Sequence, residues 1–539
     1  MPKARSQMVK GTQYAYIETS IRVKGRNYPD HKRAYIGKIV EGAFVPNAKF
    51  FMLSEEQKAA TGLTFTPPDT KIRPVGRPPA ETGLRKFRGL NLFLSEISSQ
   101  ISLQQDLTQV FGRRSAKILS IAFYLVGNPH ASLYRFSHWA RVRFHPYDKD
   151  IASPRSSELF GSITEDEVQQ FLSLRVQRSM GTSGWLAVDS SSVSSYSQGL
   201  SLVAKGRNKE HDHLEQINLL MIIDEDTNIP VFYRTMRGNI SDVSTLNNTL
   251  NDLKGIGIQK TSLVLDRGYY SKENVTYLLK RRYAFTIGTK TSLSFVQDAI
   301  KEARPLMIKP SCYDEHYQVF HAVGPVSFVV PVRGRGPNRR DAYLHLYCNK
   351  GKEADDIDTL MKRIKILKQQ LDAKEITASR MELKKYFNLT IDEKDRIIDY
   401  QEDQEKISEV VKRCGFFALL TSEKDLDAHQ ALSIYRKKDA VEKSFNNLKD
   451  RLSLRRTRCS KDENFRGKVF VQFIALILTS RIQHQMADNG LYKRFTFRTL
   501  MDEVDVIEYF TYRHRAGHWG EITKKQKKIL EAFAVLIPD

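Results

Sequence analysis

Three carboxylates lie in sequence contexts where an acid can do chemistry. Asp189 follows the apolar run "WLAV" and Asp266 follows "SLVL", so each comes at the end of a predicted buried strand. Glu442 lies instead within the basic stretch "SIYRKKDAVEKSFNNLK", residues 433–449. Ligands gather at the carboxyl ends of parallel strands, and two carboxylates there could hold divalent cations. For either aspartate alone, the alternative is an ordinary turn residue after a strand.

The stretch around Glu442 predicts a helix with two adjoining faces. At about 100° per residue, one face holds within an arc of about 60° the side chains of Tyr435, Lys438, Glu442 and Lys449. The neighbouring stripe is apolar and contains Val441, Phe445 and Leu448. Such a helix can bury its apolar stripe against a sheet and keep Glu442 at the edge of the stripe. The alternative is a solvated Lys–Glu pairing one turn apart.

The charge of the whole chain favours a polyanionic partner. Lys and Arg number 85 against 62 Asp and Glu, which gives a net charge of +23, and hydrophobic residues make up 41%. Nucleic acid is therefore the first expectation and an anionic membrane the second. The longest apolar run, residues 469–478, is about half of a membrane span, and "MPKARSQMVK" has no secretory h-region. We expect a protein without membrane segments.

Other motifs bear on whether the chain has a zinc site, a nucleotide-hydrolysing site or a histidine metal site. The four cysteines are far apart and form no CxxC pair, which argues against a zinc site and fits a reducing compartment. No GxxxxGK[ST] phosphate loop is present, so nucleotide hydrolysis is disfavoured. The "HDH" at His211–His213 is either a metal site or part of a solvated loop.

Changes in sequence texture divide the chain into seven segments. They are a β-rich module (1–63), a Pro/Gly linker (64–83), a helical domain (84–180), an α/β core in two parts (181–294 and 411–490) separated by an insertion (295–410), and a helical C-terminal region (491–539). The helical domain is interpreted as DNA-binding, or else as a scaffold. Its segment "SITEDEVQQFL" predicts a capping box of Ser162 with Glu165. The linker motif "GRPP" is either a stiff spacer or a minor-groove arm.

Within the core, the predicted order from Trp185 onward is three strands, a helix and a fourth strand that ends at Asp266. The insertion contains "VSFVVPV" and "DAYLHLYCN", which predict paired strands, followed by a helix. The strands are joined by the basic tip "RGRGPNRR". This tip either contacts DNA phosphates or is solvated, and it carries Arg333, Arg335, Arg339 and Arg340. The run "GFFALLTS" then predicts a return to the core.

These residues resemble a known signature. Tyr435, Lys438, Glu442 and Lys449 have the spacing Y-x2-R-x3-E-x6-K, which is similar to the insertion-sequence-four group of bacterial DDE transposases. Lys438 stands where that family usually has arginine, although Arg436 is nearby. The blocks "VDSSSVSSYS", "RGNISD" and "LVLDRGYYS" are also similar to this group. The resemblance runs from about residue 85 to the C-terminus, and the added segments resemble a larger sub-branch.

The resemblance implies an α/β fold with an RNase H-like core, a mixed five-stranded sheet flanked by helices, and a largely β insertion domain. Asp189, Asp266 and Glu442 would be the catalytic residues and would bind Mg²⁺, with Mn²⁺ as a substitute. Lys438 and Lys449 would contact phosphates, and Tyr435 would hydrogen-bond a phosphate or stack on a base. Arg436 is a further expected DNA contact.

The implied activity is metal-dependent cleavage at transposon ends and strand transfer into target DNA. The partners would be double-stranded DNA, as terminal inverted repeats and target, and a second copy of the chain in a homodimer. The expected location is the bacterial cytoplasm, with the nucleoid. Two alternatives share the fold: a domesticated, non-catalytic DNA-binding protein and a structure-specific nuclease. A cleavage assay separates the first alternative, and an assay for strand transfer separates the second.

Overall fold

The computed structural model shows two compact units, residues Met1–Thr82 and Gly83–Asp539. The described residues are 3–22, 24–25, 28–65, 84–179, 184–197, 199–206, 213–259, 261–331, 338–394, 396–452, 454–457, 459–512 and 516–538. The linker from residue 66 onward, including "GRPP", and residues 211–212 of "HDH" lie outside the described residues. No helix in the described part of the chain is both long and apolar enough to cross a membrane.

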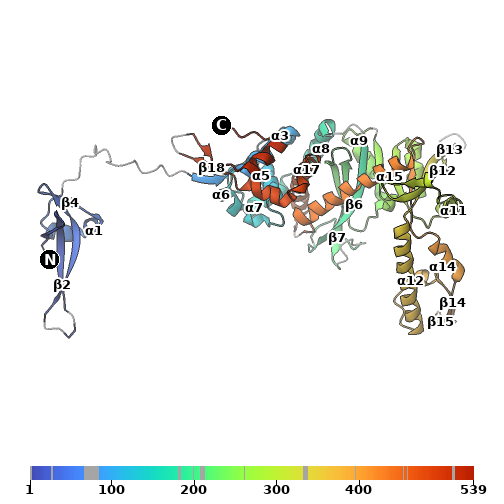
Figure 1. The fold of residues 1–539 in the computed structure, drawn as a ribbon, viewed down its shortest axis with the longest axis horizontal. Helices are drawn as coiled ribbons and strands as arrows, with labels where there is room; N and C mark the ends of the chain where they lie inside the picture. Colours follow the sequence, from blue (N-terminus) through green and yellow to red (C-terminus); the bar gives the residue numbers. More distant parts are fainter. Residues whose placement is uncertain are drawn as a thin grey trace. The chain divides into compact units, whose positions relative to one another are not determined.

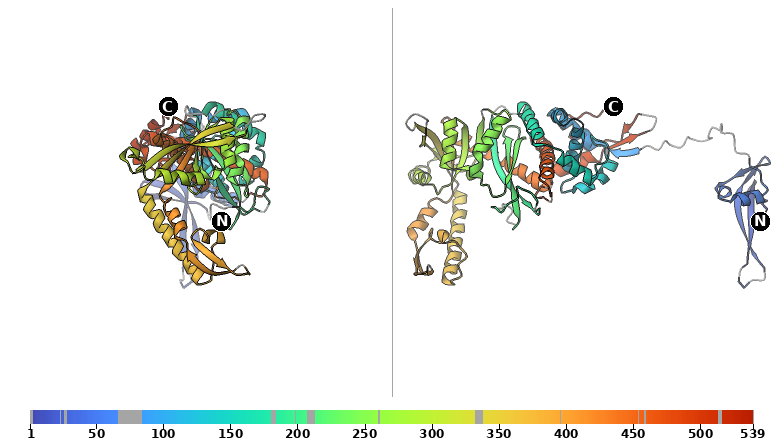
Figure 2. Two further views of the ribbon diagram at one scale, coloured as in Figure 1. Left: turned by 90° about the vertical axis from the view of Figure 1, so that its right-hand side faces the viewer. Right: turned by 180° about the vertical axis from the view of Figure 1, so that it is seen from behind.

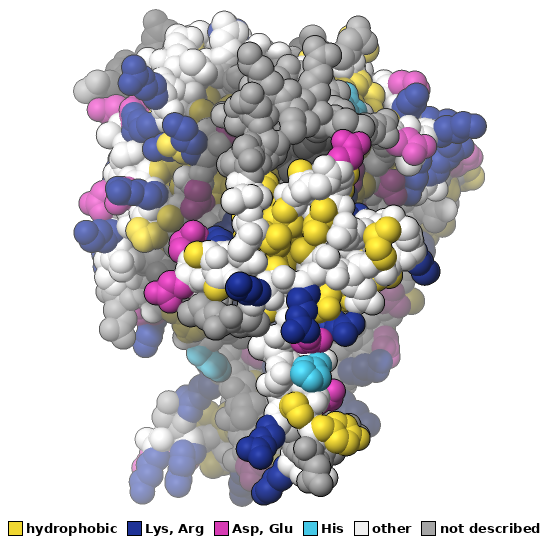
Figure 3. All heavy atoms as spheres, turned by 90° about the vertical axis from the view of Figure 1, so that its left-hand side faces the viewer, with side chains coloured by type: hydrophobic (Ala, Val, Ile, Leu, Met, Phe, Trp, Pro, Cys, Tyr) yellow, Lys and Arg dark blue, Asp and Glu magenta, His cyan; other side chains and the backbone are white. Residues whose placement is uncertain are grey.

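The first unit is a four-stranded antiparallel sheet with two short helices. The strands pair in chain order and are β1 (Arg5–Val9), β2 (Thr12–Ile21), β3 (Asp30–Val40) and β4 (Ala43–Pro46). The helices that follow are α1 (Ala48–Phe51) and α2 (Glu55–Ala60). A small core holds the sheet and α1 together, and it contains Ala15, Ile36, Phe44 and Phe50. Figure 3 draws the whole chain from one side, where lysine and arginine side chains lie dispersed among acidic and hydrophobic ones.

The second unit is built on one large mixed sheet of ten strands (Figure 1). Its order is β11-β12-β13-β16-β10-β9-β6-β7-β8, and the short β17 (Arg456–Thr457) pairs with β6. The bounds are β6 (Trp185–Ser195), β7 (Glu215–Asp224), β8 (Pro230–Arg237), β9 (Ser262–Leu265), β10 (Ala284–Thr289), β11 (Tyr313–Asp314), β12 (Val319–Val330), β13 (Asn338–Cys348) and β16 (Phe416–Thr421).

The first strands of this sheet follow the predicted order. β6, β7 and β8 form an antiparallel meander, α9 (Asp242–Gly255) crosses over, and β9 returns parallel to β6. A parallel return needs a crossover connection, and α9 provides it. The helices α10 (Lys272–Arg281) and α11 (Ser294–Ala303) flank β10 along the chain. These connections place the part of β6 that carries Asp189 next to the end of β9, which Asp266 follows.

The sheet is larger than the five strands expected. β12 and β13 form the predicted hairpin, but β13 also pairs with β16 from Tyr343 opposite Thr421 to Cys348 opposite Phe416. The hairpin therefore extends the core sheet and does not form a separate β domain. The reason is that the second half of β13 is covered on both faces: Leu344 and Leu346 are buried on one face, and His345 and Tyr347 on the other, which suits an interior strand better than an edge.

A smaller subdomain beyond β13 has its own core (Figure 2). Its elements are α12 (Lys350–Asp372), α13 (Arg380–Leu383), β14 (Phe387–Ile391), β15 (Ile397–Glu402) and α14 (Gln404–Val411). The predicted helix is α12, and its apolar residues Leu360, Ile364, Leu367 and Leu371, which recur at helical spacing, are buried in this core. Met361 points outward instead and is exposed.

A block of helices precedes β6 and packs on a long buried helix near the C-terminus. The block contains α3 (Gly89–Gln100), α4 (Leu103–Phe111), α5 (Ser115–Gly127), α6 (Phe136–Val142), α7 (Ser153–Gly161) and α8 (Glu165–Ser179). The long helix α17 (Asp462–Asp488) contacts α5, α7 and β8, so the apolar run 469–478 is a buried helix between the block and the sheet. The capping box of α8 is Thr164 with Glu167, and not the predicted Ser162 with Glu165.

The C-terminal region is not entirely helical, contrary to expectation. It contains α18 (Phe497–Asp505), β18 (Glu508–Thr511), β19 (His518–Trp519) and α19 (Lys524–Ala532). β18 pairs with β19 and with β5 (Leu84–Phe87), which begins the second unit. β18 could not be predicted because its four residues are too few to show a period-2 pattern.

Candidate active site

The parallel register of three strands brings the two predicted aspartates together. β9 pairs with β6 so that Leu265 lies opposite Val188, and β9 also pairs in parallel with β10. The next residue on each strand is therefore Asp189, Asp266 or Gly288, and these three lie at one edge of the parallel ladder. The two carboxylates, 77 residues apart in sequence (266 − 189), are neighbours for this reason.

Asp189 does not end its strand, contrary to expectation. β6 continues to Ser195 because it remains paired with β7, where Asp189 lies opposite Met221. Only the parallel partner β9 stops at Leu265. Asp266 follows it as the N-cap of a short 3-10 turn, and its carboxylate accepts a hydrogen bond from the Gly268 amide at 3.4 Å.

Two nearly continuous helices position the third acid. α15 (Ala428–Lys437) is followed directly by α16 (Asp439–Asn446), and Lys438 between them keeps helical backbone angles. The predicted apolar stripe is buried: Val441 is fully covered, and Phe445 and Leu448 are nearly so. Through this stripe α16 packs on β6 and β7, which sets Glu442 over the strand ends.

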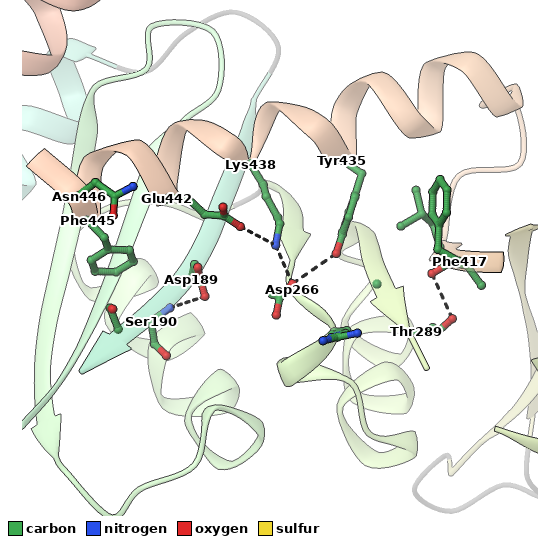
Figure 4. Close-up of a pocket in the computed structure, with 15 residues that line it drawn as sticks. Asp189, Ser190, Asp266, Thr289, Phe417, Tyr435, Lys438, Glu442, Phe445 and Asn446 are labelled. Atoms are coloured by element: carbon green, nitrogen blue, oxygen red, sulfur yellow. Dashed lines mark hydrogen bonds and ion pairs between the residues drawn. The ribbon is translucent and has the colours of Figure 1, made fainter. Parts of the chain in front are cut away.

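One cavity collects all three acids (Figure 4). Its volume is about 640 Å³, and we call it the acid pocket. It is lined by Asp189, Ser190, Ser191, Asp266, Arg267, Gly288, Thr289, Phe417, Ala418, Leu419, Tyr435, Lys438, Glu442, Phe445 and Asn446. The carboxylates thus reach one space from β6, from the end of β9 and from α16.

Lys438 links two of the three acids. Its Nζ lies 2.6 Å from Asp266 Oδ1 and 3.4 Å from Glu442 Oε1. The Tyr435 hydroxyl donates to the same Asp266 oxygen at 3.4 Å. The side chain of Lys438 is only 12% exposed, whereas that of Glu442 is 56% exposed. A positive charge is therefore held inside the acid pocket, between a half-buried and an exposed carboxylate.

These contacts shift the acid–base properties of the pocket. Burial by itself would raise the pKa of Asp266, but the hydrogen bond and charge of Lys438 outweigh it and hold that pKa below its ordinary value. Burial would lower the pKa of Lys438, but Tyr435 and Asp266 raise it well above its usual range. Burial also raises the pKa of Tyr435 to about 12. At neutral pH the pair is thus Asp⁻ and Lys⁺ beside a neutral tyrosine.

A fourth acid supports the first strand and was not singled out from the sequence. The Ser190 hydroxyl donates a hydrogen bond to Asp242, the first residue of α9, and the Ser190 amide donates to Asp189 at 2.7 Å. Asp242 is the last residue of the "RGNISD" block, and its place in that block was the feature of the sequence that could have identified it as a residue near the active site. Through Ser190, α9 fixes the backbone next to Asp189.

Lys449 lies away from the acid pocket, unlike the other three residues of the spacing pattern. It falls in a π-helical turn, Asn447–Arg451, and is 7% exposed. A π turn holds more residues than an α turn, so it shifts the angular phase of every residue after it. The expected 60° arc therefore holds for Tyr435, Lys438 and Glu442 and fails for Lys449.

The other predicted DNA contacts are dispersed. Arg436 lies on the opposite side of α15 from the acid pocket, and its guanidinium stacks over the Tyr317 ring at 4.5 Å. Arg339 is exposed on β13, and Arg340 donates to the Leu279 carbonyl at 2.5 Å. Arg333 and Arg335 lie outside the described residues.

The carboxylates are not gathered as metal ligands in this arrangement. Within the described ranges, no three His, Cys, Asp or Glu side chains come close enough together to hold a metal ion. The acids instead surround a shared space that already contains the Lys438 ammonium. That ammonium is a cation held by carboxylate oxygens, so the donor set can accept positive charge at this position.

The match that places this chain in a family is to a family model. The family model described as the transposase DDE domain matches residues 182–478, more than half of the chain. Among solved structures, the cryo-EM structure of the piggyBac transposase synaptic complex with hairpin DNA is similar, with 12% sequence identity and a TM-score of 0.37. That match covers 77% of this chain and 78% of the other. A search among curated proteins gave no match.

Proposed function

This chain belongs to the transposase DDE domain family and is a DNA transposase, and from that premise we propose that Asp189, Asp266 and Glu442 are its catalytic acids. The observation that carries the assignment is their meeting in one cavity from three separated segments, all within the matched residues 182–478. A mere turn residue or a solvated helix acid has no reason to share a cavity with the other two.

DDE transposases generally use divalent metals, and we propose Mg²⁺ for this one, with Mn²⁺ as a substitute. Asp189, Asp266 and Glu442 would hold the ions, since Mg²⁺ binds through a few carboxylates together with water and phosphate oxygens. The chemistry that bound divalent ions supply is activation of a water molecule and stabilisation of the leaving 3′ oxygen. The position of Lys438 supports this choice, because it marks where the carboxylates already favour a cation.

Lys438 and Tyr435 have a second role in this proposal. When DNA enters, the phosphate oxygens offer Lys438 an alternative to Asp266, and the ammonium can move to the phosphate without leaving the pocket. Tyr435 can then donate a hydrogen bond to the same phosphate, because burial raises the pKa of its phenol to about 12 and the hydroxyl keeps its proton at pH 7. Both residues would position the scissile phosphate rather than carry out proton transfer.

The finer classification is also a proposal. The Y-x2-K-x3-E-x6-K spacing supports the insertion-sequence-four type, and the meander β6–β8 followed by α9 and β9 supports an RNase H-like core. The family acts on DNA, and the net charge of +23 suits that polyanion. We further propose a homodimer that joins two transposon ends, acting in the bacterial cytoplasm with the nucleoid.

The test is cleavage of the element's own flanking DNA in Mg²⁺ by Asp189→Asn and Glu442→Gln. Both variants should lose cleavage and retain DNA binding when Mg²⁺ is replaced by Ca²⁺. Glu463→Gln is the matched control, because Glu463 is an exposed acid on α17 outside the acid pocket. Full cleavage by either active-site variant would remove that residue from the assignment.

A further inference from the structure

A second and larger cavity lies behind the helices that carry Glu442. Its volume is about 930 Å³, and we call it the rear pocket. On the helical wheel of α15 and α16, the residues that line it are centred about 150° from those that line the acid pocket. Its other walls come from α17, from the turn between β7 and β8, and from residues 129–130. Asn446 lines both cavities.

The lining of the rear pocket is rich in positive charge. Its basic residues are His130, Arg436, Lys437, Lys443, Arg451, His484 and Arg498. The acids in the same lining are Glu225, Asp439 and Asp450. Five lysines and arginines against three acids favour an anionic ligand over a cationic one.

Two buried polar groups in this cavity lack partners in the described part of the chain. Glu225 is only 4% exposed, and neither of its carboxylate oxygens has a hydrogen-bond partner among the described residues. The hydroxyl of Ser480, also 4% exposed, is likewise without a partner among those residues. Burial raises the pKa of Glu225 to about 8, only partly opposed by the charge of Lys437. Unsatisfied buried polar groups are rare in folded proteins and call for an explanation.

The two features together define the ligand. The basic residues require an anion, whereas Glu225 requires a hydrogen-bond donor with little or no negative charge next to it. A free phosphate would pair with the basic residues but would be repelled by the Glu225 carboxylate. A simple amine would pair with Glu225 but would be repelled by the basic residues. A nucleotide satisfies both, because its phosphates are anionic while cytosine and adenine carry exocyclic amino donors that suit a carboxylate acceptor.

We propose that the rear pocket binds one nucleotide of the DNA strand, with the exocyclic amino group of a cytosine or adenine donating to Glu225 and the phosphates meeting the basic residues. Ser480 would pair with a second polar edge atom of the base. The proposal rests on the proposed function, because the strand is that whose scissile phosphate occupies the acid pocket. Asn446 connects the two cavities, so a strand can follow the helix from one to the other. The cavity volume suits a ligand of nucleotide size.

The test compares two single-stranded probes that differ mainly in this donor. Fluorescein-labelled dC12 carries an amino donor where dT12 carries a carbonyl acceptor, and the rings have the same size. Fluorescence anisotropy in Ca²⁺ at pH 8.5, where Glu225 is ionised, should give about tenfold tighter binding of dC12 by the wild-type protein. Equal wild-type affinities for the two probes would overturn the proposal without any need of a variant.

Variants then locate the preference. Glu225→Leu should bring the two affinities within about twofold of each other by weakening dC12 and leaving dT12 unchanged. Ser480→Ala should give an intermediate ratio, and Glu463→Gln should keep the wild-type ratio. A tenfold preference that survives in a folded Glu225→Leu protein would contradict the assignment. The binding experiment does not measure cleavage, so it is independent of the catalytic assignment. If Asp189, Asp266 and Glu442 proved not to be catalytic, the ratio of dC12 to dT12 affinity would be unchanged, and if that ratio were lost, the catalytic assignment would still stand.

Discussion

The acid pocket and the rear pocket are on two sides of the same helices but differ in how their carboxylates are satisfied. In the acid pocket, Asp266 is bound by Lys438 at 2.6 Å and by Tyr435 at 3.4 Å. In the rear pocket, Glu225 has no such partner in the described part of the chain. The acid pocket thus carries an internal cation that substrate and metal must displace, while the rear pocket holds an acceptor that a ligand must complete.

This difference shows why charge alone does not identify a site. Both pockets mix acids with lysines or arginines, so their charge composition alone does not tell them apart. In the acid pocket, Lys438 already pairs with Asp266 and Glu442. A metal ion that binds there replaces one cation by another, so binding adds little cost of removing the carboxylates from water. In the rear pocket the burial cost of Glu225 remains uncompensated until a donor arrives.

The largest expected effect is on chemistry in the acid pocket. Asp266→Asn should lower the cleavage rate at least about 10³-fold, since it removes a proposed metal ligand and the partner of Lys438 together. Single-turnover cleavage in Mg²⁺ measures it, with Glu463→Gln as the control. A rate within tenfold of wild type would show that the acid pocket is not the reaction centre.

Removing the internal cation should have a smaller and more complex effect. Lys438→Met should slow cleavage about 10²-fold through loss of a phosphate contact, and should lower the free energy of unfolding by about 1–2 kcal/mol in EDTA. Added Ca²⁺ should restore more stability to this variant than to wild type, because the ion replaces the lost positive charge. Thermal unfolding with and without Ca²⁺ measures this, and equal Ca²⁺ effects in the two proteins would argue against cation exchange in the pocket.

Asp266 and Glu225 should change the free energy of unfolding in opposite directions as the pH rises. The pKa of Asp266 is lowered by folding, so its contribution is present above the unfolded pKa of about 4 and is lost as pH falls through the folded value. The pKa of Glu225 is raised to about 8 by burial, against Lys437 and beside Asp224 and Asp226. Its folded form keeps a proton that the unfolded form releases above about pH 4.5, so the free energy of unfolding falls as pH rises from about 4.5 to about 8.

Glu225→Gln isolates the second of these effects. The variant should match wild type near pH 4.5 and exceed its free energy of unfolding by about 2–4 kcal/mol at pH 9. Urea unfolding at the two pH values measures the difference. A gap that is the same at both pH values would mean that Glu225 finds a partner in solution and is not the unsatisfied acceptor of the rear pocket.

A last substitution, which changes stability only, tests how closely the acid pocket is packed. A Cβ at Gly288 would lie 2.5 Å from the Tyr435 hydroxyl and 3.1 Å from the Arg267 amide nitrogen. Gly288→Ala should therefore displace Tyr435 from Asp266 and lower the free energy of unfolding by about 1–3 kcal/mol. Gly324→Ala on β12 is the matched control, because a Cβ there meets nothing within 4 Å. Equal stability of the two variants would contradict the close approach of Tyr435.

The acid pocket was predictable from sequence because its signals are local. Asp189 and Asp266 follow apolar strand segments, and the face of the helix around Glu442 follows from a 100° repeat. The order of β6 to β9 was also predictable, since each element has a clear period. Lys449 was misplaced because a π turn changes the repeat, and nothing in "NNLKD" announces that change.

The rear pocket was not predictable because its features come from distant pairing. Glu225 is one of the acids in the turn "DEDTN", and it shares the lining of the rear pocket with residues 129–130, α16 and α17, which are far away in the sequence. The pairing of β17 with β6 and the pairing of β18 with β5 were not predictable for the same reason. Each depends on partners far along the chain, which single-segment periodicity does not report.

The most direct test of the central claim is to map the metal site on the protein itself. Fe²⁺ substituted for Mg²⁺, with ascorbate and hydrogen peroxide, cuts the backbone next to the residues that bind the ion, and mass spectrometry locates the cuts. We predict three groups of cuts, around Asp189, Asp266 and Glu442, that excess Mg²⁺ suppresses together and that Asp266→Asn weakens together. Cuts confined to one of these segments, or located elsewhere in the chain, would contradict a shared metal site in the acid pocket.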